Sequence, residues 1–359
     1  MDLDAGHRGR VMGIRQATAL YEAWLGKRLR LIAKDLKLKH AAMRSAPFPF
    51  LRATYYRWAQ TWADVCGDAA RAPQVLAVGD LHVENFGTWR DIEGRLVWGI
   101  NDFDEAWPLP YTNDLIRLAA SALLARMTCG AKMGIAAILE GYYDALEAGG
   151  RAFVLAEHHI ALRRMASARL HEPEKYWEKL RAWPLCSSPP GANRAIERLM
   201  PERGLEWRVM HRVAGLGSLG RERYVALADW HGGSVAREAK ALAPSACVWA
   251  ERGKGAAPIH YQEILDSAVR CRDPFVRVRK RWIVRRLAPD CSRIELFALP
   301  KQRDETRLLH AMGFETANVH LGSAKARLLR EDLRRRPRNW LLDAAHRMQE
   351  AVFEDFKDQ

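Results

Sequence analysis

The stretch VGDLHVENF at residues 78–86, followed by INDFDE at residues 100–105, is the most informative part of this chain. Phosphoryl transfer from ATP needs a carboxylate that orients the attacking hydroxyl and accepts its proton, and oxygen ligands that hold Mg²⁺ against the phosphates. Asp80 fits the first role. Asn85 and Asp102 fit the second, because a loop and the end of a neighbouring strand converge on one ion.

The other polar residues of these stretches have supporting roles in this interpretation. Asp104 is expected to hold a second ion or to orient the loop. His82 is expected to stabilise the loop, because no second His or Cys stands at metal-binding spacing and Asp80 already supplies the base. The alternative is that Asp80 and Asp102 are ordinary capping or turn carboxylates.

A glycine-rich segment, GLGSLG, lies between two runs that read as β-strands. Gly215, Gly217, Ser218 and Gly220 would let backbone amides approach phosphates without a Cβ in the way. A dinucleotide fold requires a helix directly after such glycines. Here two strand-like runs follow, and the second carries Lys240, which is the order found in kinases.

Lys240 is therefore expected to contact the α- and β-phosphates and to pair with an acidic residue from the following helix. Glu263 is the first choice, with Asp266 and Glu251 as rivals. In kinases the glycine-rich turn precedes the catalytic loop, whereas here it follows it. A circular permutation explains this order, because a fold whose ends lie close together can be cut elsewhere without changing its core.

The pattern of helix-like and strand-like segments divides the sequence into four regions. The fold class expected is α+β, a two-lobed protein kinase-like fold in permuted order, with a helical catalytic lobe, then a small antiparallel β lobe, then closing helices. The regions are an N-terminal helical region (1–74), a large lobe with the catalytic and metal loops (75–200), a small β-rich lobe (201–300) and C-terminal helices that complete the large lobe (301–359).

Within these regions the expected strands and helices have approximate limits. Helices are expected over residues 13–65, with a break at the two prolines of 45–50, and again from residue 114 to about 200. Strands are expected at 74–78, 95–103, 207–213, 223–228, 234–241, 275–278 and 282–287, with a helix at 261–270. The C-terminal helices are expected at 308–319, 324–333 and 340–353.

Four pieces of the chain resemble parts of one known kinase group. GDLHxxN at residues 79–85 resembles the catalytic loop of the aminoglycoside and choline kinase group, and DFD at 102–104 resembles its metal-binding motif. Asp114 stands at the start of a helix that, in this group, supports the catalytic loop, and residues 308–321 look like the helix that leads into it. Val78 departs from the pattern, since related kinases usually carry a histidine there.

Taken together, residues 46–52, the two acidic motifs, the glycine-rich segment and Lys240 resemble an uncharacterised bacterial family, domain of unknown function 2252. This resemblance implies a distant kinase relative, and it supplies a fold and a site without a substrate.

The composition limits which partners, metal sites and cellular compartments can be expected. The 359 residues carry a net charge of +14, and their six cysteines are scattered singly, without zinc or redox spacing. No secretory signal and no apolar run long enough to span a membrane is apparent, so a cytoplasmic protein without a membrane partner is expected. The basic stretches 277–286 and 325–338 are read as solvated faces, with nucleic acid as the alternative partner.

The function expected from these motifs is ATP- and Mg²⁺-dependent transfer of a phosphoryl group to a hydroxyl of an acceptor, either a small molecule or a protein. One alternative keeps the fold and changes the chemistry to nucleotidyl transfer or to ATP binding without turnover. The other is a basic nucleic-acid-binding protein in which the motifs are accidental.

Overall fold

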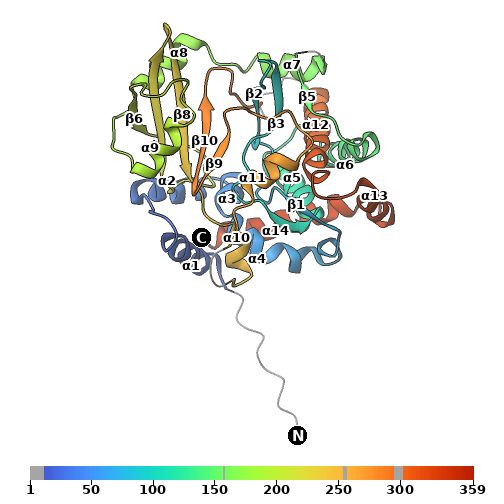
Figure 1. The fold of residues 1–359 in the computed structure, drawn as a ribbon. Helices are drawn as coiled ribbons and strands as arrows, with labels where there is room; N and C mark the ends of the chain where they lie inside the picture. Colours follow the sequence, from blue (N-terminus) through green and yellow to red (C-terminus); the bar gives the residue numbers. More distant parts are fainter. Residues whose placement is uncertain (1–11, 157, 254–256, 295–301) are drawn as a thin grey trace.

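The computed structural model describes residues 12–156, 158–253, 257–294 and 302–359, and its architecture is α+β as expected (Figure 1). Helices come first, small antiparallel sheets occupy the middle of the chain, and helices return at the end. No described helix is long and apolar enough to cross a membrane. The predicted boundary between regions at 300 and 301 lies outside the described residues.

The N-terminal region is helical, as predicted. The prolines predicted to break the pattern instead begin a helix, because proline is tolerated in the first turn, where its missing N–H has no intrahelical partner. The elements are α1 (Ile14–Gly26), α2 (Ala33–Met43), α3 (Pro47–Ala53), α4 (Tyr55–Cys66) and a 3₁₀ turn (Gly67–Ala70).

Two small antiparallel sheets follow. One pairs β1 (Gln74–Ala77) with β4 (Trp107–Pro110), and the other joins β2 (Phe86–Arg90), β3 (Leu96–Ile100) and β5 (Phe153–Val154) in that order. The predicted strands at 74–78 and 95–103 are confirmed as β1 and β3. Strands β2 and β4 were not predicted, since β2 continues directly from the acidic loop and β4 contains two prolines.

The large helical region is built around α5 (Thr112–Leu124), which is buried along nearly its whole length. Two long antiparallel helices, α6 (Ala131–Ala148) and α12 (Gln302–His320), pack closely against each other. Where their backbones meet, only glycine fits. A Cβ added at Gly141 would lie 1.9 Å from the carbonyl oxygen of His310, and one at Gly313 would lie 1.9 Å from that of Ile138. These two glycines therefore let the backbones touch.

Three of the remaining helices cover this centre, namely α7 (Ile160–Ser167), α13 (Ala326–Arg335) and α14 (Trp340–Lys357). The C-terminal helices form where they were predicted, and α14 packs along α5. The other two, α8 (Pro173–Arg181) and α9 (Pro190–Glu197), pack against the five-stranded sheet.

The third sheet has five antiparallel strands in the order β6-β7-β8-β10-β9 and lies to one side of the helical region (Figure 1). All five strands were predicted within a few residues. They are β6 (Arg208–His211), β7 (Arg223–Trp230), β8 (Gly233–Ala241), β9 (Arg277–Arg279) and β10 (Trp282–Leu287), with α10 (Ala246–Ala250) and α11 (Tyr261–Ser267) between β8 and β9.

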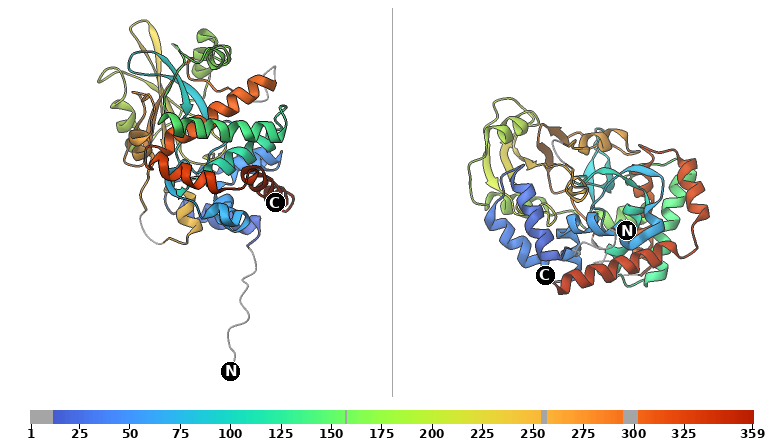
Figure 2. Two further views of the ribbon diagram at one scale, coloured as in Figure 1. Left: turned by 90° about the vertical axis from the view of Figure 1, so that its right-hand side faces the viewer. Right: turned by 90° about the horizontal axis from the view of Figure 1, so that it is seen from below.

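The start of α1 and the end of the chain lie side by side (Figure 2). Arg15 donates hydrogen bonds of 3.0 Å to the backbone carbonyl oxygens of Asp358 and Gln359. The first described helix therefore contacts the end of the chain.

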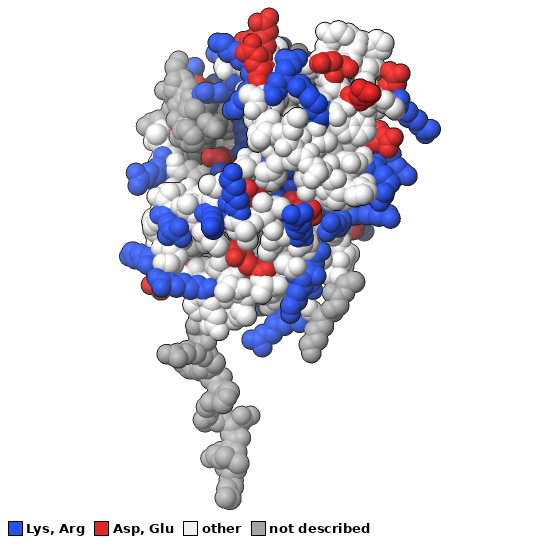
Figure 3. Space-filling model, turned by 90° about the vertical axis from the view of Figure 1, so that its left-hand side faces the viewer, with Lys and Arg blue, Asp and Glu red and all other residues white. Residues whose placement is uncertain are grey.

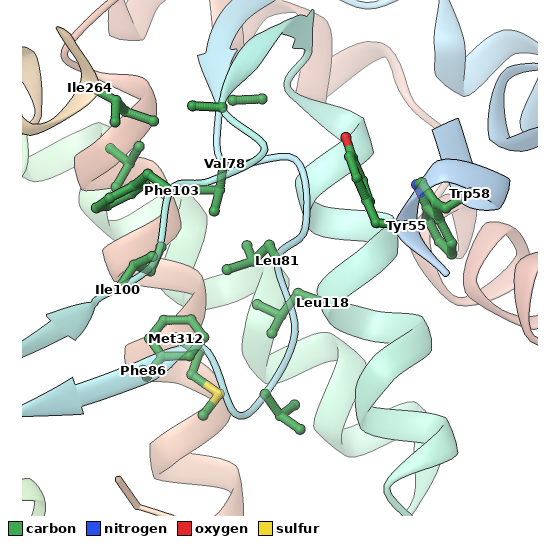
Figure 4. Close-up of a cluster of buried hydrophobic side chains, with 14 of the residues drawn as sticks. Tyr55, Trp58, Val78, Leu81, Phe86, Ile100, Phe103, Leu118, Ile264 and Met312 are labelled. Atoms are coloured by element: carbon green, nitrogen blue, oxygen red, sulfur yellow. The ribbon is translucent and has the colours of Figure 1, made fainter. Parts of the chain in front are cut away.

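Buried apolar side chains surround the loop at residues 78–86 (Figure 4). Leu81 points from this loop toward Leu118 of α5, and Val78 lies beside Phe103. All four side chains are at most 1% exposed. The loop is thus anchored on both sides in the core, which fixes the direction of the polar side chains between these anchors.

Candidate functional site

One buried carboxylate on α5 holds the acidic loop between β1 and β2 in place. Asp114, which is fully buried on α5, accepts hydrogen bonds from the backbone amides of Val78 (2.6 Å) and Gly79 (3.0 Å). His320 at the end of α12 lies 3.0 Å from the same carboxylate. Asp114 therefore supports the loop from α5, and His320 links α12 to the same carboxylate.

Gly79 is required by the tight path of this loop. Its φ is +80°, and a Cβ there would lie 2.3 Å from the backbone oxygen of Glu105. His82 stabilises the loop as expected, since its Nδ1 accepts from the amide of Glu84 at 3.2 Å and burial lowers its pKa well below the usual value.

Asp80 is fixed by a buried arginine that sequence reasoning missed. Arg117 of α5 is fully buried, and its Nε donates to Asp80 Oδ1 at 3.0 Å, with a second bond from Nη2 to the same oxygen. The guanidinium lies over the rings of Tyr55 (4.9 Å) and Trp58 (4.8 Å). In the sequence, Arg117 is recognisable only as the single basic residue of a mostly apolar helix.

This arrangement leaves the two oxygens of Asp80 in different surroundings. Oδ1 accepts from Arg117, whereas Oδ2 faces the glycine-rich segment, since a Cβ added at Gly217 would lie 3.1 Å from it. Burial raises the pKa of Asp80, and the Arg117 cation acts in the opposite direction. A carboxylate with a raised pKa and one oxygen free of Arg117 is suited to accept a proton.

Asn85 joins the loop to the end of β3. Its Nδ2 donates to the backbone oxygens of Asp102 (2.9 Å) and Asp80 (3.3 Å). Its Oδ1 is buried and has no hydrogen-bond donor among the described residues. An unsatisfied buried acceptor is costly, so this oxygen is available for a cation.

Lys240, on β8, contacts the two aspartates of the predicted metal-binding motif at residues 102–104. Its Nζ is 3.0 Å from both carboxylate oxygens of Asp102 and 2.7 Å from Asp104 Oδ1, although 138 residues separate Lys240 from Asp102. Burial acts to raise the pKa of Asp102, but Lys240 and its cationic neighbours outweigh it and hold that pKa below its usual range. Burial and the Asp102 charge raise the pKa of Asp104.

The predicted partner of Lys240 is wrong. Glu263 on α11 is 63% exposed in its side chain and pairs with His260 at 2.6 Å. The rivals also lie elsewhere, since Asp266 pairs with Arg272 and Glu251 accepts from Trp107. The two metal-motif aspartates already surround Lys240, so a helix acid has no place beside it.

The glycine-rich segment lies over Asp80 and is held there by the N-terminal helices. Lys39 of α2 donates to the carbonyl oxygen of Gly217 at 3.2 Å, and the amide of Ile32 donates to that of Gly220 at 2.8 Å. Gly215 and Gly220 have φ values of +72° and +98°, which favour glycine. Ser218 accepts from Arg223 at 2.7 Å.

These elements enclose one pocket of about 60 Å³. Seven of the predicted site residues line it, namely Asp80, Asn85, Asp102, Asp104, Gly215, Gly217 and Ser218. Lys240, Gly220 and Glu263 do not line it, although Lys240 contacts Asp102 and Asp104 of the lining. Five basic residues that were not predicted also line the pocket, namely Lys39, Arg52, Arg221, Arg285 and Arg293.

A buried ion cluster lies in the five-stranded sheet above this pocket. Glu238, fully buried on β8, is bound by Arg212, Arg223 (3.1 Å) and Arg285 (2.7 Å). These cations hold the pKa of Glu238 well below its usual value despite its burial. Sequence patterns do not reveal this cluster, because its members lie on three different strands and just after a fourth.

The donor set suits magnesium only in part. Among the described residues no three His, Cys, Asp or Glu side chains gather into a metal-binding group. Asp102, Asp104 and the Oδ1 of Asn85 supply hard oxygen ligands, and Mg²⁺ is commonly held by one or two carboxylates together with substrate phosphates. The residues therefore fit a magnesium ion that arrives with a phosphorylated ligand.

Positive charge on the surface is dispersed. On the face shown in Figure 3, Lys and Arg side chains are scattered and Asp and Glu side chains lie between them. Within the two basic stretches many cations are paired. Arg281 binds Glu222, Arg286 binds Asp290 and Arg330 binds Glu147.

No curated protein and no solved structure shows significant similarity to the chain. One family model matches residues 30–177, a span that contains the acidic loop, Asp102 and Asp114 but ends before the glycine-rich segment and Lys240. The resemblance predicted from the sequence is thereby confirmed over that span. The matching model is that of a family described as an uncharacterized protein conserved in bacteria, DUF2252, and residues 30–177 of this chain are similar to it.

Proposed function

We propose that this protein is an ATP- and Mg²⁺-dependent phosphotransferase that acts on a hydroxyl group. The observation that carries the proposal is the contact of Lys240 with Asp102, 3.0 Å long, beside Asp80 and under the glycine-rich segment. Four separate motifs predicted for one reaction lie around one pocket. Accidental capping carboxylates would have no reason to converge with a lysine from another sheet.

We further propose that the fold is kinase-like in permuted order. The glycine-rich segment joins β6 to β7, Lys240 lies on the neighbouring strand β8, and the acidic loop lies opposite on the helical side. The bonds from Arg15 to the C-terminal residues support the permutation. With six free cysteines among the described residues, the reducing cytoplasm is the proposed compartment.

Asp80 is assigned the role of base. Its Oδ2 takes the proton of the acceptor hydroxyl. At the same time the hydroxyl oxygen forms a bond to the γ-phosphorus, and the bond from that phosphorus to the β,γ-bridging oxygen breaks, which releases ADP. Arg117 keeps the carboxylate in place through Oδ1. The raised pKa of Asp80 makes it a better proton acceptor than an exposed aspartate.

Asn85, Asp102 and Asp104 would hold Mg²⁺, which neutralises phosphate charge when bound. Lys240 would exchange its contacts with the aspartates for contacts with phosphate oxygens. A pocket of about 60 Å³ has room for a few water molecules only. Nucleotide binding therefore requires the glycine-rich segment and its contacts from Lys39 to move away from Asp80.

The test uses ATP labelled at the α- or the γ-phosphate, with water and a bacterial small-molecule extract as acceptors. The expected result is γ-label on a product, lost in Asp80→Asn and Asp102→Asn and retained in the control Asp229→Asn, whose side chain is 78% exposed on β7. Transfer of the α-label would indicate nucleotidyl transfer instead. Equal turnover in Asp102→Asn and in the unchanged protein would overturn the proposal.

A further inference from the structure

A second pocket of about 120 Å³ adjoins the candidate site. Asn101, Arg285 and Arg293 line both pockets, so these three side chains lie between them. The second pocket lies between the β2–β3 hairpin, α11 and β10. None of the residues assigned to catalysis lines it, and it has no role in the function proposed above.

The wall of this second pocket is strongly cationic. Its lining contains five arginines and one carboxylate, which are Arg212, Arg270, Arg285, Arg286, Arg293 and Asp273. Trp89, Phe103 and Tyr261 supply its aromatic side. Burial raises the pKa of Asp273, the one carboxyl group in the lining. So many guanidinium groups around a small cavity favour an anionic occupant.

Carboxylates that do not line the pocket neutralise part of the positive charge of these arginines. Arg212 and Arg285 share the buried carboxylate of Glu238, and Arg286 pairs with Asp290 at 2.9 Å. These arginines are held in position by carboxylates outside the pocket lining. Guanidinium groups fixed in this way are preorganised to donate hydrogen bonds to a ligand.

Two arginines remain poorly compensated. The carboxylate beside Arg293 is that of Glu84, at 3.8 Å, which is near the limit of an ion pair. Arg270 donates from Nη2 to the backbone oxygen of Ile100 at 2.9 Å, but its Nε and Nη1 are buried and have no acceptor among the described residues.

Arg270 also lies over the rings of Trp89 (4.7 Å) and Phe103 (5.1 Å), which fix the plane of its guanidinium. Stacking compensates the charge in part but does not satisfy buried N–H donors. An acceptor oxygen from a ligand would satisfy them. The tetrahedral oxygens of a phosphate group match several guanidinium donors at once.

We propose that the second pocket is an anion subsite that binds a phosphate group of a substrate, reached from the candidate site past Arg285 and Arg293. This inference rests on the proposed function and narrows it: the molecule that occupies the cleft carries a phosphate in addition to the one transferred. That phosphate belongs either to a phosphorylated acceptor or to the nucleotide itself.

The test is calorimetric titration of the full chain with inorganic phosphate at constant ionic strength. We expect Arg270→Met to weaken phosphate binding at least about tenfold, because it removes charged hydrogen-bond donors to the phosphate. Arg293→Met is expected to act in the same direction. Its side chain is 44% exposed, so it remains folded and informative if the first variant unfolds. Arg279→Met, exposed on β9, is the matched control.

Absence of millimolar phosphate binding, or equal affinity in all four proteins, would overturn the subsite. Saturating Mg·ATP distinguishes the two sources of the phosphate. If ATP abolishes phosphate binding, the nucleotide occupies the subsite, and if phosphate still binds, the acceptor does. Asp102→Asn separates this inference from the proposed function, because it is expected to lose Mg·ATP binding and to keep the phosphate site.

Discussion

Replacing Lys240 by methionine removes the cation that lies between the two metal-motif aspartates. Its Nζ lies 2.7–3.0 Å from the oxygens of Asp102 and Asp104, and the side chain is 1% exposed. At about 3 Å and an effective dielectric constant of about 20, each attraction is on the order of 5 kcal/mol. The ammonium loses hydration on burial, which offsets much of this gain.

We expect a net loss of about 3–5 kcal/mol in the free energy of unfolding, the range for breaking a buried ion pair by removing one partner. Urea denaturation at neutral pH measures it. Lys280→Met, at the exposed turn between β9 and β10 of the same sheet, is the control and is expected to change stability by less than about 0.5 kcal/mol. A loss below about 1 kcal/mol in Lys240→Met would refute the reasoning.

The same variant has a predictable dependence on pH and on magnesium. Lys240 depresses the pKa of Asp102, so the stability from this pair is present above the unfolded pKa and is lost as pH falls through the lower folded value. The difference between the two proteins should therefore shrink in acid. Without the lysine, Mg²⁺ should raise the unfolding midpoint of the variant more than that of the unchanged protein.

Three further predictions address the supports of the site. Asp114→Asn removes the charged acceptor of two loop amides, so we expect a loss of about 3 kcal/mol in urea denaturation together with lower transfer activity. Gly217→Ala puts a Cβ about as close to Asp80 as contact allows, 3.1 Å away, so calorimetry should show weaker Mg·ATP binding, whereas the control Gly233→Ala should bind normally. Glu315 of α12 accepts a hydrogen bond from the amide of Ile100 at the end of β3 (3.3 Å), and burial raises its pKa to about 7, so the unchanged protein should lose stability as pH rises from the unfolded value toward neutrality. Glu315→Gln should abolish that loss, about 2–3 kcal/mol, when denaturation is compared at mildly acidic and neutral pH, and an unchanged slope would contradict it.

The parts of the site that lie on short motifs could be predicted from the sequence. Asp80, Asn85 and Asp102 stand in fixed order within two stretches, and the run around Lys240 could be read as a strand that follows a glycine turn. The supporting role of Asp114 came from the resemblance to the aminoglycoside and choline kinase group. Local spacing was sufficient in each case, since the chemistry limits which residue types serve it.

Contacts between distant elements could not be predicted. Arg117 was visible only as an interruption in an apolar run, and its pairing with Asp80 depends on how α5 packs under the loop. Lys39 reaches the glycine-rich segment from a helix whose position is set by tertiary packing. Glu263 was chosen because it lies on the helix after Lys240, but the direction of that helix turns it toward solvent.

The central claim is that the acidic loop and the lysine-bearing sheet enclose one Mg·ATP. A crystal structure of the protein with Mg²⁺ and a non-hydrolysable ATP analogue tests it most directly. We predict Mg²⁺ bound to Asn85 Oδ1 and the Asp102 carboxylate, and Lys240 in contact with phosphate oxygens. A nucleotide bound elsewhere, or a Lys240–Asp102 contact that remains intact at saturating Mg·ATP with no ligand between the two elements, would contradict the claim.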